Sequence, residues 1–134
     1  MANEPIEDAE REGAYALLQR GLALIKSRHH AQAAIVLERA SRAEPGKGSI
    51  LEPLGRAYHH SGQFERARET FEALLDVDPS AHWAHFALAT TLRKLGRDAE
   101  ARTHLRLAVA LHPDSELYRR ALARVEARLN PDAA

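Results

Sequence analysis

Three prolines recur at equal intervals, and this interval constrains the fold more strongly than any other feature of the sequence. Pro45, Pro79 and Pro113 are 34 residues apart. Four further columns keep the same spacing: Gly21, Gly55 and Ala89; Ala33, Ala67 and Ala101; Leu24, Tyr58 and Leu92; Leu37, Phe71 and Leu105. Self-similarity at a period of about 20 to 50 residues is the signature of repeat architectures. The chain is therefore predicted to fold as a short array of equal units, each packed on its neighbours.

The apolar residues within each unit predict two helices joined by a turn. In the second unit they recur every three or four residues, at Leu51, Leu54, Ala57 and Tyr58 and then at Ala67, Phe71, Leu74 and Leu75. Gly62 and Gly96 interrupt this pattern in the middle of their units, as a tight turn between helices requires. The recurring prolines then end the second helix, because proline lacks an N–H and clashes with the preceding turn.

The second unit also carries a family motif. It reads L-x2-L-G-x2-Y, then A-x3-F and then proline, at Leu51, Leu54, Gly55, Tyr58, Ala67, Phe71 and Pro79. This resembles the tetratricopeptide repeat (TPR), whose signature is W-x2-L-G-x2-Y, A-x3-F and a closing proline. The resemblance covers nearly the whole chain. It implies an all-α fold, a right-handed α-solenoid of three TPR helix–turn–helix repeats plus a C-terminal capping helix, with seven helices in all.

The repeat register also sets the expected boundaries. The segments are an acidic N-terminal arm or an extension of the first helix (1–13), TPR 1 (14–47), TPR 2 (48–81), TPR 3 (82–115), the capping helix (116–129) and a disordered tail (130–134). Residues 1–13 hold five acidic side chains and one arginine, a net charge of −4, whereas residues 93–128 hold nine basic and five acidic side chains, a net charge of +4. The two regions are either solvated helix faces or partners that meet, in one molecule or between two.

The glycine-rich stretch 44–49, EPGKGS, has some likeness to a phosphate-binding loop. The pattern G-x-x-x-x-G-K-[ST] requires Ser or Thr after the lysine, but Gly48 follows Lys47. The pattern also requires a preceding strand, and a helix is predicted here. We interpret the stretch as the joint between the first two repeats, with Ser49 and Glu52 spaced to form a capping box for the next helix.

The composition excludes several other classes of protein. Hydrophobic residues make up 45% of the 134 residues, which is typical of a folded globular chain. The absence of cysteine excludes disulfides and cysteine-ligated metals. No apolar run approaches the roughly 20 residues of a membrane helix, and the acidic N-terminus lacks the features of a signal peptide. We therefore expect a cytoplasmic protein with no membrane partner, and the formal net charge of zero argues against nucleic acid as a partner.

The resemblance implies where a partner binds. In the TPR family the first helix of each pair lines a concave groove in which partner peptides usually dock. The corresponding positions give the expected peptide-binding residues: Tyr15, Leu18, Leu22, Ile25, Arg56, His59, His60, Trp83, Phe86, Arg93 and, in the capping helix, Arg120 and Arg124. The implied function is a non-enzymatic protein–protein interaction module, an adaptor or assembly factor, that binds a partner peptide in this groove.

The groove is expected to be apolar at one end and basic further along. Trp83, Phe86 and Tyr15 would anchor apolar side chains, and the arginines would attract acidic groups of the peptide. The alternative for Trp83 and Phe86 is that they pack against neighbouring helices.

An aliphatic stripe is expected in the first repeat, at Leu18, Leu22 and Ile25. A bare stripe of this kind would be an exposed apolar patch, which usually marks an interaction site. A partner segment, a second copy of the protein or the chain's own N-terminal arm would cover it. The first alternative function is therefore a homo-oligomerising scaffold, such as a homodimer, formed through the apolar face of the first repeat.

Some members of the family bind the C-terminal carboxylate of a peptide, and the residues that do so form a motif that can be compared with this sequence. Members that bind Hsp70 or Hsp90 tails grip the C-terminal carboxylate of the peptide with two lysines, two asparagines and an arginine. The matching positions here hold Leu18, Leu22, Pro53, Trp83 and Ala87. None of the five matches, so the carboxylate clamp of the Hsp70/Hsp90 type is predicted to be absent.

The sequence offers no candidate site for catalysis, a metal or a cofactor. No nucleophile is spaced to meet both a base and an orienting group. Among the eight histidines, His82 and His85 are spaced i, i+3, but no third ligand is positioned beside them. We expect the histidines to lie in loops and on the surface, where His59 and His60 would make the charge of the groove sensitive to pH between about 5 and 7.

The arginine-rich closing segment leaves a further alternative, a nucleic-acid accessory protein. Its four arginines lie within residues 119–128, but acidic residues interrupt them and no aromatic platform accompanies them. This alternative has the weakest support in the sequence.

Overall fold

The computed structural model of the protein describes residues 4–133, with side chains described from Gly13 to Asp132. This part of the chain contains helices and no strand, which confirms the predicted all-α class. The seven α-helices are α1 (Glu4–Lys26), α2 (His30–Ala43), α3 (Gly48–His60), α4 (Phe64–Val77), α5 (His82–Lys94), α6 (Asp98–Leu111) and α7 (Glu116–Leu129). A short 3₁₀ helix, η1 (Pro131–Ala133), follows them in the segment that was expected to be a disordered tail.

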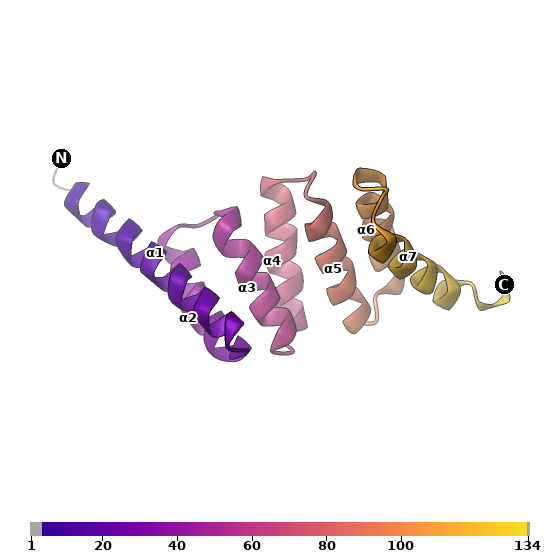
Figure 1. Cartoon of the computed structure of the whole chain (residues 1–134), viewed down its shortest axis with the longest axis horizontal. Coiled ribbons are helices and arrows are strands. Elements are labelled where there is room, and N and C mark those ends of the chain that lie inside the picture. The colour runs from indigo at the N-terminus through magenta and orange to yellow at the C-terminus, as the bar shows by residue number, and fades with distance from the viewer. Residues whose placement is uncertain (1–3, 134) are drawn as a thin grey trace.

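The helices form three antiparallel pairs in a row, with α7 at the end of the row (Figure 1). Each helix packs chiefly on the next one in the sequence, and α3 also contacts both α1 and α5. The odd-numbered helices therefore lie next to one another and form one face of the stack. This is the arrangement that the 34-residue period predicts, because each pair buries its apolar residues against its neighbours.

Small residues let the two helices of a pair approach closely. A Cβ atom added to Gly55 of α3 would lie 2.5 Å from the Phe71 ring of α4, and one added to Gly21 of α1 would lie 2.4 Å from Leu37 of α2. The third pair holds the buried residues Ala89 and Leu105 at the corresponding positions. We call this contact column the seam of each repeat.

The turns inside the repeats share a left-handed backbone conformation. Gly62 and Gly96 have φ values of +80° and +76°, and glycine adopts this region without steric cost. The first repeat has Arg28 at the corresponding position, with φ of +65°. An arginine at this φ is strained, because its Cβ crowds the backbone.

The start of α3 differs from the prediction. The residue that precedes the helix is Lys47, and no side chain caps the helix. The capping box predicted from Ser49 and Glu52 is therefore wrong, since Glu52 instead pairs with Arg56 one turn along. Pro53 lies within this helix and is buried.

The first helix is longer than the others. It spans 23 residues, against 13 or 14 for the helices α2 to α7, and its N-terminal turns extend past the rest of the stack (Figure 1). The acidic segment of the sequence lies in these turns.

Between residues 4 and 133, no helix combines the length and the hydropathy that a membrane span requires.

Candidate binding pocket in the groove

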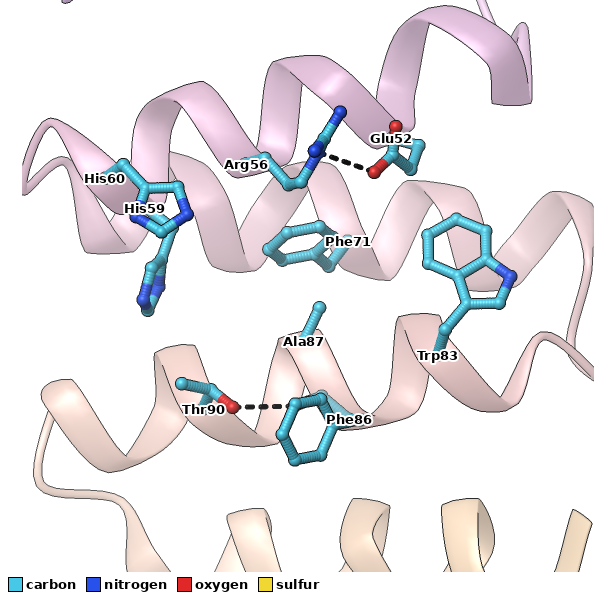
Figure 2. A pocket seen from close by; sticks show the side chains of 9 residues that line it. All are labelled: Glu52, Arg56, His59, His60, Phe71, Trp83, Phe86, Ala87 and Thr90. Carbon is cyan, nitrogen blue, oxygen red and sulfur yellow. Dashed lines mark hydrogen bonds and ion pairs between the residues drawn. The ribbon is translucent and has the colours of Figure 1, made fainter. Parts of the chain in front are cut away.

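A pocket opens between α3 and α5 on the face formed by the odd-numbered helices. Its volume is about 310 Å³. Four lining residues come from α3, four from α5 and one from α4: Glu52, Arg56, His59 and His60; Trp83, Phe86, Ala87 and Thr90; and Phe71 (Figure 2). Five of the expected binding residues line it together: Arg56, His59, His60, Trp83 and Phe86.

The pocket has an apolar floor and a partly exposed aromatic rim. Phe71 is almost fully buried beneath it, and Ala87 of α5 points toward Phe71 (Figure 2). Trp83 stands at one end and keeps 38% of its surface exposed. Phe86 lines the pocket and also stacks on Tyr118 of α7, with 5.0 Å between the ring centroids. An apolar side chain of suitable size would therefore find aromatic contacts here.

The charge of the pocket centres on one ion pair. Arg56 Nε lies 2.6 Å from a carboxylate oxygen of Glu52, one helical turn away. Burial raises the pKa of Glu52, and the nearby Arg56 opposes this shift. The guanidinium is therefore already paired, although 44% of the Arg56 side chain remains accessible to a partner.

The tautomer of His59 follows from its neighbours. Thr91 Oγ1 donates its hydrogen to the carbonyl of Ala87 at 3.0 Å. The same oxygen lies 3.0 Å from His59 Nδ1, so it must accept a hydrogen bond from that nitrogen. Neutral His59 therefore carries its proton on Nδ1, and Nε2 has a free lone pair. Burial lowers the pKa of His59, and the neighbouring His60 and Lys94 lower it further.

His60 lies at the same end of the pocket, against the first repeat. Its ring centroid is 4.8 Å from that of His30 and 5.3 Å from that of His59. Burial lowers the pKa of His60, and electrostatic repulsion from His30, Arg56 and Arg28 adds to this effect. This end of the pocket thus holds uncharged imidazoles in a cationic setting.

Sequence reasoning missed four of the lining residues. Glu52 and Thr90 were not among the expected binding residues. Both occupy groove-facing positions of the repeat register, so the register could have predicted them. Ala87 had been considered only as a position of the carboxylate clamp. Phe71 belongs to the second helix of its repeat, and it reaches the pocket only because Gly55 leaves room beside it.

The expected residues of the first repeat lie away from this pocket. Tyr15 is 65% exposed on α1. Leu18, Leu22 and Ile25 are only partly exposed, and Leu18 and Ile25 pack against the hydrophobic core. The stripe that would be bare in an open groove is therefore partly covered by the protein itself, because α1 leans on its neighbouring helices.

The remaining expected arginines are also outside the pocket. Arg93 is partly buried, and its Nε is a buried atom without a hydrogen-bond partner among the described residues. Arg120 pairs with Glu116 at 2.7 Å, and Arg124 is exposed on α7.

Two other histidine clusters are present, and His85 in one of them corrects the expectation that the histidines lie in loops and on the surface, whereas His112 in the other is exposed just after α6. His85 is only 7% exposed; its Nε2 lies 2.9 Å from the Pro79 carbonyl and its Nδ1 3.0 Å from His104 Nδ1. His82 stacks on His112 and bonds to the Tyr118 hydroxyl at 2.7 Å. Within the described residues, no three His, Asp or Glu side chains are grouped to hold a metal ion.

The sequence matches a known repeat family over most of its length. The model of the tetratricopeptide repeat family matches residues 24–85 and again residues 60–125. The chain belongs to the tetratricopeptide repeat family. Superkiller complex protein 3 of Mus musculus is 32% identical over 100 residues, which cover 75% of this chain and 6% of that protein. The human protein of the same name is 33% identical over 87 residues, again 6% of its length. The chain thus corresponds in length to a small part of these relatives.

Solved TPR structures share the fold at low sequence identity. The first TPR of Spaghetti (RPAP3), bound to the HSP90 peptide SRMEEVD, has a TM-score of 0.82 at 17% identity, over 88% of this chain and 94% of that one. MamA from Desulfovibrio magneticus RS-1 has a TM-score of 0.84 at 20% identity, over 87% of this chain and 66% of that one. The TPR fold is that of a protein–protein interaction module.

Proposed function

We propose that the protein is a non-enzymatic adaptor or assembly factor that binds a peptide segment of a partner protein along the face formed by α1, α3, α5 and α7. The pocket between α3 and α5 receives an apolar side chain of this segment. Arg56 and Arg93, with Arg120 and Arg124 further along, attract its acidic groups. We place this role in the cytoplasm.

The observation that carries this proposal is the half-exposed Trp83 at the rim of an apolar pocket. An indole that served only the fold would be expected to bury more of its surface, and tryptophan is enriched among residues that dominate binding energy. Phe71 and Phe86 supply an aromatic floor and wall, so an inserted side chain would lose most of its contact with water. A TPR of the same fold, the first one of Spaghetti, was solved with a bound peptide.

Selection from a random peptide library, followed by calorimetry with a selected peptide, tests the proposal. Trp83→Ala should weaken binding by about ten- to a hundredfold, because an anchored aromatic contributes about 1.5–3 kcal/mol. Arg93→Glu should weaken binding of acidic peptides. Ile35→Ala is the matched control, because Ile35 is an exposed apolar residue of α2, outside the pocket. Unchanged affinity in both Trp83→Ala and Arg93→Glu would contradict the proposal.

We also propose that the protein lacks the carboxylate clamp. Pro53 is buried within α3, while Trp83 and Ala87 line the apolar pocket, so these positions offer no cation to a terminal carboxylate. If the peptide SRMEEVD binds at all, amidation of its C-terminus should leave its affinity unchanged. A large loss on amidation would show that a clamp exists.

Self-association through the first repeat remains an alternative with weaker support. Its stripe is partly covered within the chain, as described above for Leu18 and Ile25. Light scattering over a range of concentrations separates it from the adaptor role, since a strict monomer at high concentration would rule it out.

A further inference from the structure

The histidine end of the pocket is built to accept a proton without losing a hydrogen bond. Because His59 Nδ1 donates to Thr91, the free Nε2 is the site at which a proton would add. Protonation there leaves the bond to Thr91 in place. His59 can therefore change its charge while α3 and α5 stay as they are.

The groups that lower the pKa of these histidines are bases, of which the lysine and the two arginines carry the positive charge. Lys94 of α5 and His60 of α3 act on His59; His30 of α2, Arg56 of α3 and Arg28 of the α1–α2 turn act on His60. Glu52 is the one acidic residue that lines the pocket, and it is already paired with Arg56. Because like charges oppose protonation, the empty pocket keeps its histidines neutral in a region of positive potential.

We propose that this pocket recognises an apolar side chain followed by a carboxylate, and that His59 or His60 takes up a proton when the carboxylate binds. This inference rests on the proposed function and adds that peptide binding is regulated by pH. Charge complementarity selects the occupant, because an acidic segment would be attracted by Lys94, Arg56 and Arg28 before any proton is taken up. The apolar floor beside them receives the neighbouring side chain. Acidic segments are therefore bound more tightly in mildly acidic solution.

The sign of the effect follows from linkage. A carboxylate close to an imidazole favours the charged imidazole and so raises its pKa in the complex. Burial and neighbouring cations hold the pKa of His59 and His60 below the ordinary 6.5 in the free protein. Binding is therefore coupled to proton uptake as the pH falls below about 6.5, whereas a glutamate of the ligand stays ionised at pH 5.5. Each pKa unit of this upward shift corresponds to about a tenfold gain in affinity.

Two matched peptides test the proposal, Ac-Phe-Glu-Glu-NH2 and Ac-Phe-Gln-Gln-NH2. Trp83 is the only tryptophan of the chain, so intrinsic fluorescence reports occupation of the pocket. Both peptides should perturb it. The glutamate peptide should bind about three- to tenfold more tightly at pH 5.5 than at pH 7.5, whereas the glutamine peptide should bind equally at both. Circular dichroism at each pH checks that the protein remains folded.

Variants and direct titration locate the proton. His59→Gln with His60→Gln should abolish the pH dependence, and His112→Gln is the control, because His112 stacks on His82 near the far end of α5. If the double variant does not fold, NMR titration of the wild type decides: the glutamate peptide should raise the pKa of His59 or His60, and the glutamine peptide should not.

The outcomes separate the two proposals. Equal affinity of the glutamate peptide at both pH values, with Trp83 perturbed, would overturn the proton-linked inference and leave the pocket as a binding site. A pH dependence that survives in the double variant would also overturn it. If neither peptide perturbs Trp83 at either pH, the pocket is not a binding site for such segments, and both this inference and the pocket's role in the proposed function are wrong.

Discussion

Helix α3 has two sides that are packed in opposite ways, and both involve Phe71. Toward α4, Gly55 meets the Phe71 ring so closely that an added Cβ would lie 2.5 Å from it. Toward α5, the same ring forms the floor of a pocket of about 310 Å³. The seam has no room for an additional methyl group, whereas the pocket has room for a side chain of another molecule.

The residues on the two sides differ in how they recur along the sequence. Seam positions repeat with the same type of residue, as in Gly21 and Gly55 or Leu37 and Leu105. Pocket positions do not: the residues one period away from Trp83 are Ser49 and Leu117. The comparison teaches that the repeated columns specify the fold, while columns that change from repeat to repeat line the pocket.

The largest effect is expected where the seam meets the rigid ring of Phe71, which lies within 3.0 Å of an added Cβ at three of its atoms. Gly55→Ala should destabilise the protein by about 1–2 kcal/mol, because the overpacking cost exceeds the helix propensity gained with alanine. Gly13→Ala is the control: Gly13 lies in α1 with nothing within 4 Å of an added Cβ, so the same change should stabilise by about 0.5–1 kcal/mol. Urea unfolding measures both.

A compensating change sharpens this prediction. In Gly55→Ala combined with Phe71→Leu, the seam takes the residues that the third repeat holds at Ala89 and Leu105. The double variant should therefore lose less stability than the two single variants added together, with a coupling energy of about 0.5–3 kcal/mol. Strict additivity would show that Phe71 does not limit the space at Gly55.

A smaller effect is expected at two adjacent threonines of α5, one of which is buried while the other lines the pocket. Thr91 is fully buried and accepts the hydrogen bond of His59, so Thr91→Val should cost about 1 kcal/mol by leaving that N–H without its partner. Thr90 lines the pocket and bonds only to the Phe86 carbonyl of its own helix. Thr90→Val should change the free energy of unfolding by less than about 0.5 kcal/mol. Equal losses in thermal or urea unfolding would contradict the distinction.

The first repeat lacks the glycine that the other two repeats have in the turn between their helices, and replacing its residue with glycine is predicted to increase stability. Arg28 has φ of +65° where the other repeats have Gly62 and Gly96. Arg28→Gly should stabilise the protein by up to about 1 kcal/mol, because glycine relieves the left-handed strain. A Gly62→Arg variant should show the opposite sign. A destabilised Arg28→Gly protein would mean that the arginine side chain contributes more than its backbone costs.

The smallest expected effect concerns pH and the histidine pair between α5 and α6. The Pro79 carbonyl can only accept, so His85 Nε2 carries a proton and His85 Nδ1 accepts from His104. The pKa of His104 is lowered, first by burial and then by His85, although Glu72 and Glu100 oppose this. The unfolded chain therefore binds this proton more readily, and stability that is present above about pH 6.5 is lost as the pH falls.

Unfolding by urea at pH 7.5 and pH 5.5 measures this loss. His104→Gln should lose less stability between the two pH values than the wild type, because its amide can donate to His85 without titrating. An identical pH dependence in the two proteins would assign the acid sensitivity to other groups. As with His59, the proton would add to Nε2 of His104, which keeps the Nδ1–H bond to His85, so the loss of stability comes first from burial of the charge.

Much of the fold, and part of the pocket, is predictable from the sequence. The residues that recur with a period of 34 predict paired helices, and the resemblance to the tetratricopeptide repeat implied seven of them, as the structure has. The same register predicted that Trp83, Phe86 and His59 face one groove. It did not predict Phe71 as the pocket floor. Phe71 belongs to the second helix of its repeat, and its ring reaches the groove because Gly55 has no side chain to block it.

The sequence by itself determined the repeat, the helical pairs and the side of each first helix that faces the groove, because periodic burial of apolar residues leaves one helical face for each role. Only the tertiary structure decided which groove residues meet. Arg56 pairs with Glu52, Leu18 packs against the core, and His85 is buried beside His104. These contacts depend on angles and distances between helices, which a one-dimensional period does not specify.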